Sequence, residues 1–215
     1  MSDKCVHVVN IGDFMPEIWQ VTYPLICKYV ERIDADLNII TQRKYPEWHI
    51  LYEKVQVHRD GAGYAHNFLL DADVLIHPKF PDFTTVCHQY HVGFNDNFDA
   101  DQYFDTSINP YFMRDGRNVG IASNAVITCR YTHDLWQPLQ YTADEAKRFL
   151  LHDRSGVDEF TLSENLARYG LKYNGITWED WQRYYFVHLG TDRYKDTSAQ
   201  IRGVLEMWRS DGTEA

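Results

Sequence analysis

The sequence predicts one α/β domain with a mostly parallel central sheet and a loop-rich second half. Three observations support this fold class. Apolar strand-like runs alternate with segments of helical periodicity before residue 77, the span 77–118 has little periodicity, and the last third is mostly helical. At 215 residues, 44% of them hydrophobic, the chain is long enough to bury one substantial core.

The first 40 residues predict a strand, a helix and a second strand. The apolar run 5–9 is typical of a central parallel strand, and Gly12 follows it, where the backbone can approach a ligand closely. Apolar residues recur at helical spacing after Pro24. Because proline is tolerated in a first turn, we expect a helix over about 23–33. A strand at 37–40 would complete a right-handed unit if it is parallel to the first.

The middle of the chain predicts a helix, a strand and a long loop region. Residues 46–57 have helical character, and an apolar strand is expected at 67–70 after a glycine-containing turn. The span 77–118 is rich in Asp, Asn, Pro and aromatic residues, and loops of that length in a compact domain are usually functional. A further strand is expected at 119–129.

The last third predicts three helices and one short strand. A capping box at 142–145 opens the first helix, and the second spans 157–169 and stops at Gly170. Alternating residues at 184–188 predict a short strand. Apolar residues over 201–208 have the spacing of a terminal amphipathic helix.

Composition restricts the partners and the compartment. The formal charge is −10 and Lys and Arg form no cluster, so we expect no polynucleotide partner. A small nucleotide remains compatible, because one divalent cation can neutralise its phosphates. No apolar run is long enough to span a membrane, and the polar start is not a signal peptide. The four cysteines are far apart, which indicates free thiols in a reducing cytoplasm.

The tripeptide Asp-Ala-Asp occurs three times, at 34–36, 71–73 and 99–101. The first copy lies between a helix end and a strand start, and the third has no apolar strand before it. Only Asp71 and Asp73 directly follow an apolar strand. This places them at the carboxyl end of a strand, where open α/β sheets bind ligands.

Asp71 and Asp73 predict a metal site. In extended backbone, residues two apart point to the same face, and two carboxylates there are costly unless a cation lies between them. Hard oxygen ligands with open positions suit Mg²⁺ or Mn²⁺ bridging two phosphates. A solvated turn after the strand is the alternative interpretation of the same residues.

A resemblance to GT-A-type glycosyltransferases is carried by the segment 68–76, with the sequence FLLDADVLI, which is similar to their DxD segment. The order of the other segments agrees: a first strand ending at 9–12, a strand segment at 120–125, an acidic pair at 158–159 and a late His-x-Gly pattern at 188–190. The similarity covers nearly the whole chain. The compact size also resembles glycosyltransferase modules that large algal viruses use on capsid glycoprotein.

The resemblance implies an enzyme with a nucleotide-sugar donor, with UDP favoured over GDP, and a glycan or glycoprotein acceptor. It implies a nucleotide-binding half at 1–76 and an acceptor-binding half at 77–215 of a single domain. Asp71 and Asp73 would bind Mn²⁺ or Mg²⁺, and His188 would be a third ligand or a diphosphate contact. If the protein is viral, its location would be the host cytoplasm.

The resemblance also implies which residues contact the donor. Residues near the first strand would line the base and the ribose, Lys54 would reach the donor, and Asn124 would face the sugar or the acceptor. An exposed helix lysine is the alternative for Lys54. The implied donor-binding residues are Val9, Asn10, Gly12, Lys54, Asp71, Ala72, Asp73, Asn124, His188 and Gly190.

Asp158 and Glu159 are the candidates for catalysis, as acceptor contacts or as the general base. A base must lie within hydrogen-bond reach of the attacking hydroxyl. The alternative is a structural role, because acidic residues in the first turn of a helix complement its dipole. Inversion and retention both stay open, since a retaining enzyme can lack an obvious base.

Three other functions are alternatives. A haloacid-dehalogenase-like phosphatase also carries Asp-x-Asp after an apolar strand, but that motif normally opens the domain, whereas about a third of this chain precedes Asp71. A nucleotidyltransferase needs a glycine-rich basic loop after the first strand, and the segment 12–15 is not one. A non-catalytic glycan-binding module on the same fold would need neither metal nor nucleotide.

Overall fold

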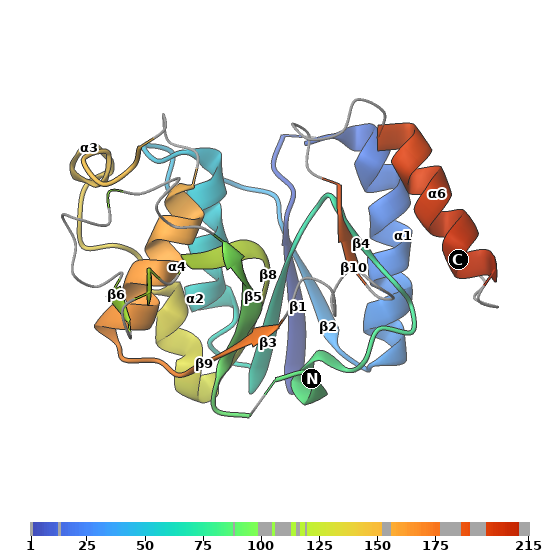
Figure 1. The fold of residues 1–215 in the computed structure, drawn as a ribbon, viewed down its shortest axis with the longest axis horizontal. Coiled ribbons are helices and arrows are strands. Elements are labelled where there is room, and N and C mark those ends of the chain that lie inside the picture. The colour runs from blue at the N-terminus through green and yellow to red at the C-terminus, as the bar shows by residue number, and fades with distance from the viewer. Residues whose placement is uncertain are drawn as a thin grey trace.

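A six-stranded sheet with the order β2-β1-β3-β8-β5-β9 forms the centre of the computed structural model (Figure 1). β1 is parallel to β2 and β3, and β5 is parallel to β9. β8 runs antiparallel to its neighbours β3 and β5. The remaining five strands of this sheet all run in the same direction. The prediction of a mostly parallel sheet is therefore confirmed. The strands are β1 (Lys4–Val9), β2 (Asp36–Ile40), β3 (His66–Asp71), β5 (Val92–Phe98), β8 (Gly120–Cys129) and β9 (Tyr173–Ile176).

The structure describes residues 2–12, 14–87, 89–98, 105, 113–114, 117–118, 120–151, 156–176, 186–189 and 197–210. Two strand pairs lie outside the sheet: β4 (Val74–Ile76) with β10 (Phe186–His188), and β6 (Met113–Arg114) with β7 (Arg117–Asn118). The α-helices are α1 (Pro16–Arg32), α2 (Val57–Asp60), α3 (Ala143–Ala146), α4 (Val157–Arg168) and α6 (Thr197–Ser210). The 3₁₀ helices are η1 (Ile50–Gln56), η2 (Phe83–Thr85) and η5 (Arg130–Trp136). None of the helices described here has both the length and the apolar character that a membrane span requires.

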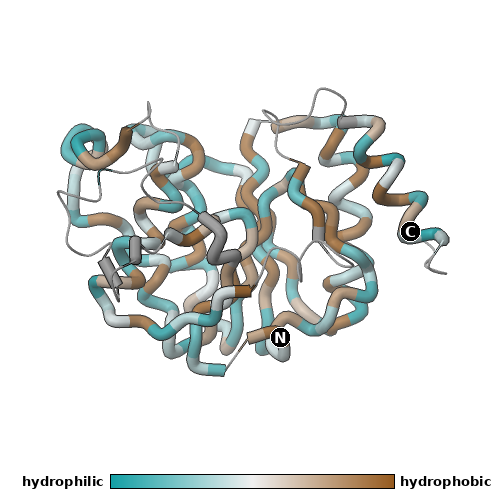
Figure 2. The backbone as a smooth tube through the Cα atoms, in the orientation of Figure 1, coloured by the Kyte–Doolittle hydropathy of each residue, from teal (hydrophilic) through white to brown (hydrophobic). Residues whose placement is uncertain are grey.

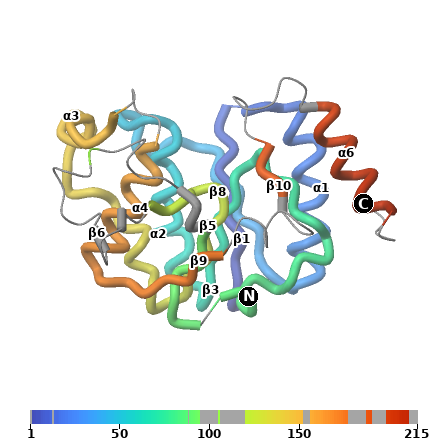
Figure 3. Tube along the Cα trace, viewed as in Figure 1, coloured from blue at the N-terminus to red at the C-terminus, as the bar shows by residue number. Residues whose placement is uncertain are grey.

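Helices cover both faces of the sheet, and alternate residues of β3 enter opposite cores. Phe68 packs in the cluster that contains Tyr29 of α1, whereas Leu69 packs in the cluster that contains Leu162 of α4. Figure 2 shows hydrophobic residues gathered along the central strands between these helices. The C-terminal helix α6 lies beside α1, although the two are far apart in sequence (Figure 3), and Trp208 is buried there.

The predicted start of the first helix is wrong, because α1 begins at Pro16 instead of near Tyr23. Pro16 occupies the first turn, and Pro24 lies inside the helix, where it costs one backbone hydrogen bond. Packing on the turns before Pro24 keeps the helix continuous. Thr22 is fully buried, and its hydroxyl donates a 2.7 Å hydrogen bond to the carbonyl oxygen of Ala72.

Three other predicted segments differ from the structure. Within 46–57, helical backbone begins only at Ile50, as the 3₁₀ helix η1. The span 77–118 contains β5, whose Gly, Asn and Asp residues hide it from propensity rules, although β8 and β9 pair with it on both sides. The helix at 142–145 has both capping-box hydrogen bonds but ends at Ala146. The other predicted strands and helices are present where the structure describes them, and residues 119, 184 and 185 of the predicted strands lie outside the described residues.

His7 in β1 is a fully buried histidine. Its Nε2 lies 2.8 Å from Oδ1 of Asn67, and its Nδ1 lies 3.1 Å from Nδ2 of Asn38, so Nε2 donates and Nδ1 accepts. Burial lowers the pKa of His7 from its ordinary value of 6.5 to about 4. The folded chain therefore keeps this side chain neutral while the unfolded chain takes up a proton below pH 6.5. Consequently, stability contributed by His7 is lost as the pH falls from 6.5 towards 4.

We expect the substitution His7→Gln to reduce the acid sensitivity of the fold. Glutamine can donate and accept hydrogen bonds here without titrating. Between about pH 7 and 4.5, the wild type should therefore lose about 2 kcal/mol more unfolding free energy than the variant. Urea denaturation of both proteins at the two pH values measures this difference. Equal losses in the two proteins would show that His7 is not held neutral.

Candidate functional site

One edge of the sheet gathers the candidate residues. Val9 is in register with Asp71, so the carboxyl ends of β1 and β3 lie side by side. β8 is antiparallel to β3 and pairs Ala125 with Leu70, so β8 brings Ser123, near its start, to the same edge. Ligands of open α/β sheets bind at the carboxyl ends of the parallel strands. Asp71 therefore lies at the carboxyl end of β3, as the sequence predicted.

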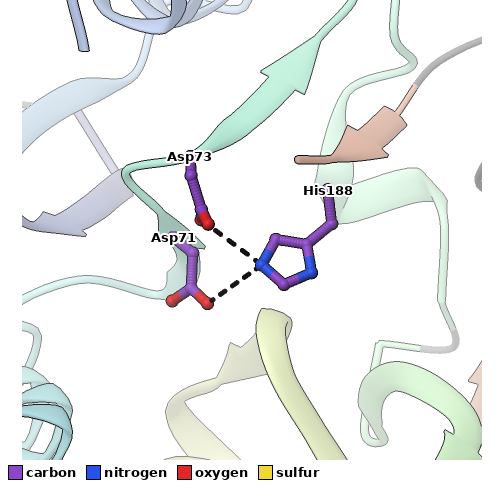
Figure 4. Close-up of side chains that lie close together, drawn as sticks. All are labelled: Asp71, Asp73 and His188. Carbon is purple, nitrogen blue, oxygen red and sulfur yellow. Dashed lines mark ion pairs between the residues drawn. The ribbon is translucent and has the colours of Figure 1, made fainter. Parts of the chain in front are cut away.

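Asp71, Asp73 and His188 converge at this edge (Figure 4). One ligand atom from each residue lies within 4.8 Å of the others. Nε2 of His188 is 3.3 Å from Oδ1 of Asp73 and 3.9 Å from Oδ2 of Asp71. The pairing of β10 with β4 places His188 opposite Val74, and the amide of Leu189 donates to the carbonyl oxygen of Asp73 at 3.0 Å. Two carboxylates and one imidazole form a donor set that fits Mg²⁺ or Mn²⁺.

The pKa shifts of Asp71, Asp73 and His188 reflect two carboxylates held close together. Burial and the charge of Asp73 raise the pKa of Asp71, although Lys54 opposes the shift. Burial also opposes ionisation of Asp73, but the hydrogen bond from His188 outweighs it and lowers the pKa of Asp73. Burial disfavours the charged form of His188, yet its contacts with Asp73 outweigh burial and raise its pKa. A bound cation would relieve the repulsion between the two carboxylates.

Lys54 is buried beside Asp71, with 3% of its surface exposed. The alternative of an exposed helix lysine is therefore wrong. Its Nζ lies 2.6 Å from Oδ1 of Asp71, 2.7 Å from Oδ2 of Asp158 and 2.9 Å from Oγ of Ser123. Burial lowers the pKa of this amine, but the charges of Asp158 and Asp71 outweigh burial and raise it. Lys54 thus joins a candidate metal ligand to the acidic pair of α4.

Asp158 and Glu159 lie in the first turn of α4, next to Ser123. Oγ of Ser123 is 2.6 Å from Oδ2 of Asp158 and 2.7 Å from Oε1 of Glu159. Burial opposes ionisation of Asp158, but the charge of Lys54 outweighs it and lowers the pKa of Asp158. Burial and the neighbouring charge of Asp158 raise the pKa of Glu159 well above its ordinary value. Their catalytic role stays a prediction, and their position also suits the helix dipole.

An open pocket of about 420 Å³ lies beyond the end of β1. Oδ1 of Asn10 is buried and has no hydrogen-bond partner within the described part of the chain. The rings of Trp19 and Tyr23 lie 5.0 Å apart at this pocket. Val9 does not line the pocket, because its side chain packs against the core beside α4. The pocket is lined by Asn10, Gly12, Trp19, Tyr23, Ile39 and Thr41.

The remaining candidate residues have varied surroundings. Asn124 is 7% exposed, and its Oδ1 has no hydrogen-bond partner among the residues that are described. The side chain of Ala72 packs in the core beside α1. Only the backbone of Ala72 therefore belongs to the site, where it sets the spacing of Asp71 and Asp73. Gly190 lies outside the described residues. Of the other Asp-Ala-Asp copies, 34–36 lies where β2 begins, at the opposite edge of the sheet, and 99–101 lies outside the described residues.

Sequence reasoning missed Ser123 and the aromatic pair Trp19 and Tyr23. Ser123 and Asn124 are adjacent polar residues in a mostly apolar strand, and buried polar groups need partners, so this signal was available. Trp19 and Tyr23 were hidden by the wrong start of α1. Their spacing of four residues places them on one face of the helix.

Solved structures share this fold, whereas no protein-family model and no curated protein matches the chain. A crystal structure of a glycosyltransferase involved in the glycosylation of the major capsid of PBCV-1 is 10% identical, with a TM-score of 0.55, and the match covers 91% of this chain and 99% of that chain. A putative nucleotide-diphospho-sugar transferase from Desulfovibrio desulfuricans is 11% identical, with a TM-score of 0.46 and 98% of each chain covered. A third structure is a Drosophila β-1,4-galactosyltransferase 7 mutant that was solved with manganese, UDP-Gal and xylobiose. It is 10% identical, with a TM-score of 0.44, and the match covers 87% of this chain and 71% of that chain. The chain therefore has a GT-A-like fold that resembles the fold of a viral glycosyltransferase.

Proposed function

We propose that the chain is a metal-dependent glycosyltransferase that moves a sugar from a nucleotide-sugar, UDP-sugar before GDP-sugar, to a glycan or glycoprotein. The convergence of Asp71, Asp73 and His188 at the carboxyl edge of the sheet is the observation that carries this proposal. These three side chains would hold Mn²⁺ or Mg²⁺. When bound, the cation would neutralise the negative charge that develops on the diphosphate leaving group.

The pocket beyond β1 is the proposed site for the nucleoside. It lies at the same edge as the aspartates, because β1 and β3 are adjacent in the sheet. Oδ1 of Asn10, which has no partner among the residues that the structure describes, can accept a hydrogen bond from a base or a ribose hydroxyl. The rings of Trp19 and Tyr23 offer a surface for stacking. Gly12 leaves the backbone there open to a ligand, since, apart from its chain neighbours, no described residue has an atom within 4 Å of the position its Cβ would take.

Lys54 is proposed to orient the site instead of contacting the donor. Its ammonium already has three partners, Asp71, Asp158 and Ser123, within 3 Å. Lys54 holds Oδ1 of Asp71, which leaves Oδ2 facing His188. A fixed carboxylate costs less entropy when it binds a cation.

The second half of the chain is proposed to bind the acceptor. Asp158 and Glu159 lie on α4 and Asn124 lies on β8, and Asp158 shares the ammonium of Lys54 with Asp71. The role of Gly190 in the donor site stays a prediction, because this residue lies outside the described residues. The cysteines Cys5, Cys27, Cys87 and Cys129 are free thiols, which supports a reducing compartment such as the cytoplasm, or the host cytoplasm if the protein is viral. The charge of −10 supports the expectation of no polynucleotide partner.

Calorimetric titration of UDP and GDP, each with and without Mn²⁺, tests the proposed function. We expect UDP to bind in the presence of Mn²⁺ and to bind at least about tenfold more weakly without it, because the metal bridges protein and diphosphate. UMP is the matched control. It keeps the base and the ribose but lacks the diphosphate, so its binding should depend little on Mn²⁺. If neither UDP nor GDP bound, with or without Mn²⁺, the proposal would be contradicted.

A further inference from the structure

The hydroxyl of Ser123 contacts three charged or titratable groups at once. Its Oγ lies 2.9 Å from Nζ of Lys54, 2.6 Å from Oδ2 of Asp158 and 2.7 Å from Oε1 of Glu159. Ser123 and Asp158 are each 2% exposed, whereas Glu159 is half-buried, so the contacts of Ser123 with Lys54 and Asp158 lie away from bulk water. All three distances lie within the range of hydrogen bonds.

Hydrogen-bond counting shows that one of the two carboxyl groups carries a proton. A serine hydroxyl has one hydrogen to donate and two lone pairs to accept with. An ammonium can only donate, so Lys54 uses one lone pair of Ser123. The single hydrogen of Ser123 can satisfy Asp158 or Glu159, but not both. If both were ionised, the other contact would bring two oxygen lone pairs within 2.7 Å with no hydrogen between them.

The surrounding charges place the proton on Glu159. Asp158 forms a 2.7 Å ion pair with Lys54, which stabilises its ionised form. No ion pair joins Glu159 to a cation among the residues that the structure describes. Lys54 from η1 already faces two carboxylates, Asp158 of α4 and Asp71 of β3, and Ser123 of β8 is uncharged. Ionising Glu159 would add a third negative charge around one positive charge in a buried region.

We propose that Glu159 is a neutral carboxylic acid at neutral pH, which donates a hydrogen bond to Ser123 while Ser123 donates to ionised Asp158. Glu159 is then a positioning residue that acts through Ser123 on Asp158. Burial and the charge of Asp158 also raise the pKa of Glu159, in agreement with this assignment. The consequence for catalysis rests on the proposed function: Glu159 cannot take the proton of an acceptor hydroxyl until it has lost its own.

The stability of Glu159→Gln as a function of pH tests the assignment without nucleotide or metal. Glutamine mimics a neutral acid and cannot ionise. In the wild type, the folded chain keeps a proton on Glu159 that the unfolded chain releases above its ordinary pKa of 4.5. Wild-type stability should therefore fall relative to the variant as the pH rises. We expect the ratio of the variant's folding constant to that of the wild type to increase about tenfold per pH unit between about pH 5 and 7.

Glu206→Gln is the matched control, because Glu206 is an exposed glutamate on α6, and its ratio to the wild type should stay nearly constant over the same pH range. A flat or falling ratio for Glu159→Gln would overturn the assignment.

Infrared spectroscopy of the wild type with ¹³C-labelled glutamate provides a second readout that does not depend on the folding of a variant. A protonated-carboxyl band at pH 7 is expected, and a spectrum with only ionised glutamate bands would also overturn the proposal. Both readouts are independent of nucleotide binding, so a failed titration with UDP would leave them interpretable.

Discussion

Replacing Asp73 with asparagine should weaken Mn²⁺-dependent binding of UDP by at least about 100-fold. Losing a partner that merely orients a metal ligand typically costs 10- to 100-fold in metal affinity, and loss of a charged ligand should cost at least as much. Asparagine keeps the shape of the side chain but removes one negative charge from the group formed by Asp71, Asp73 and His188. Calorimetry with UDP, and Mn²⁺ binding followed by electron paramagnetic resonance, would measure the loss.

Asp34→Asn is the matched control for this substitution, because Asp34 belongs to another copy of the same tripeptide. Asp34 is exposed and has a φ of +53°, in the left-handed region that asparagine adopts readily. It lies before β2, at the edge of the sheet opposite the candidate metal ligands. Its replacement should leave UDP binding unchanged. If Asp73→Asn bound UDP and Mn²⁺ as tightly as Asp34→Asn, the metal site would have to lie elsewhere.

The substitution Lys54→Met should destabilise the fold by about 3–5 kcal/mol, the typical cost of removing one partner from a buried ion pair. Methionine has a similar length but leaves Asp71 and Asp158 without the ammonium that lies 2.6 and 2.7 Å from them. Asp158 is 2% exposed, so water cannot replace the lost partner. Equilibrium denaturation in urea, with the wild type measured in parallel, gives the difference in unfolding free energy.

A second substitution and a surface control show whether the loss comes from unpaired charge. The double variant with Lys54→Met and Asp158→Asn should recover part of the lost stability, because it removes one of the two uncompensated carboxylates. Lys147→Met breaks an exposed pair with Asp144, and such surface pairs typically contribute less than about 1 kcal/mol. If Lys54→Met cost no more than Lys147→Met, the ammonium of Lys54 would not be holding the two carboxylates.

Lys54, Asp71 and Asp158 form one network of ion pairs. Lys54 contacts Asp71 on one side and Asp158 on the other, so it joins the proposed donor half of the site to the proposed acceptor half. A change at either carboxylate alters the partners of the same ammonium. We therefore expect Asp71 and Asp158 substitutions to be non-additive in stability, as is usual for residues that share one ion-pair network.

Most of the architecture follows from local sequence patterns. The apolar runs of β1 and β8 and the stop of α4 before Gly170, which has a φ of +59°, are encoded within a few neighbouring residues. The candidate metal ligands Asp71 and Asp73 were also found locally, because an acidic pair directly after an apolar strand lies at the ligand-binding edge of a parallel sheet. The pairing of β10 with β4 then brought His188, which only the family resemblance had singled out, beside them.

The tertiary structure alone decided the features that depend on contacts between distant segments. The start of α1 and the existence of β5 were mispredicted, because packing of Thr22 on Ala72 and pairing with β8 and β9 outweigh weak local propensities. The sequence by itself singled out Asp71 and Asp73 as candidate metal ligands. It could not show that Lys54 is buried, or that Ser123 contacts both Asp158 and Glu159, because those contacts join η1, β3, β8 and α4. Charge–charge energies depend on distance and burial in three dimensions, and a linear pattern encodes neither.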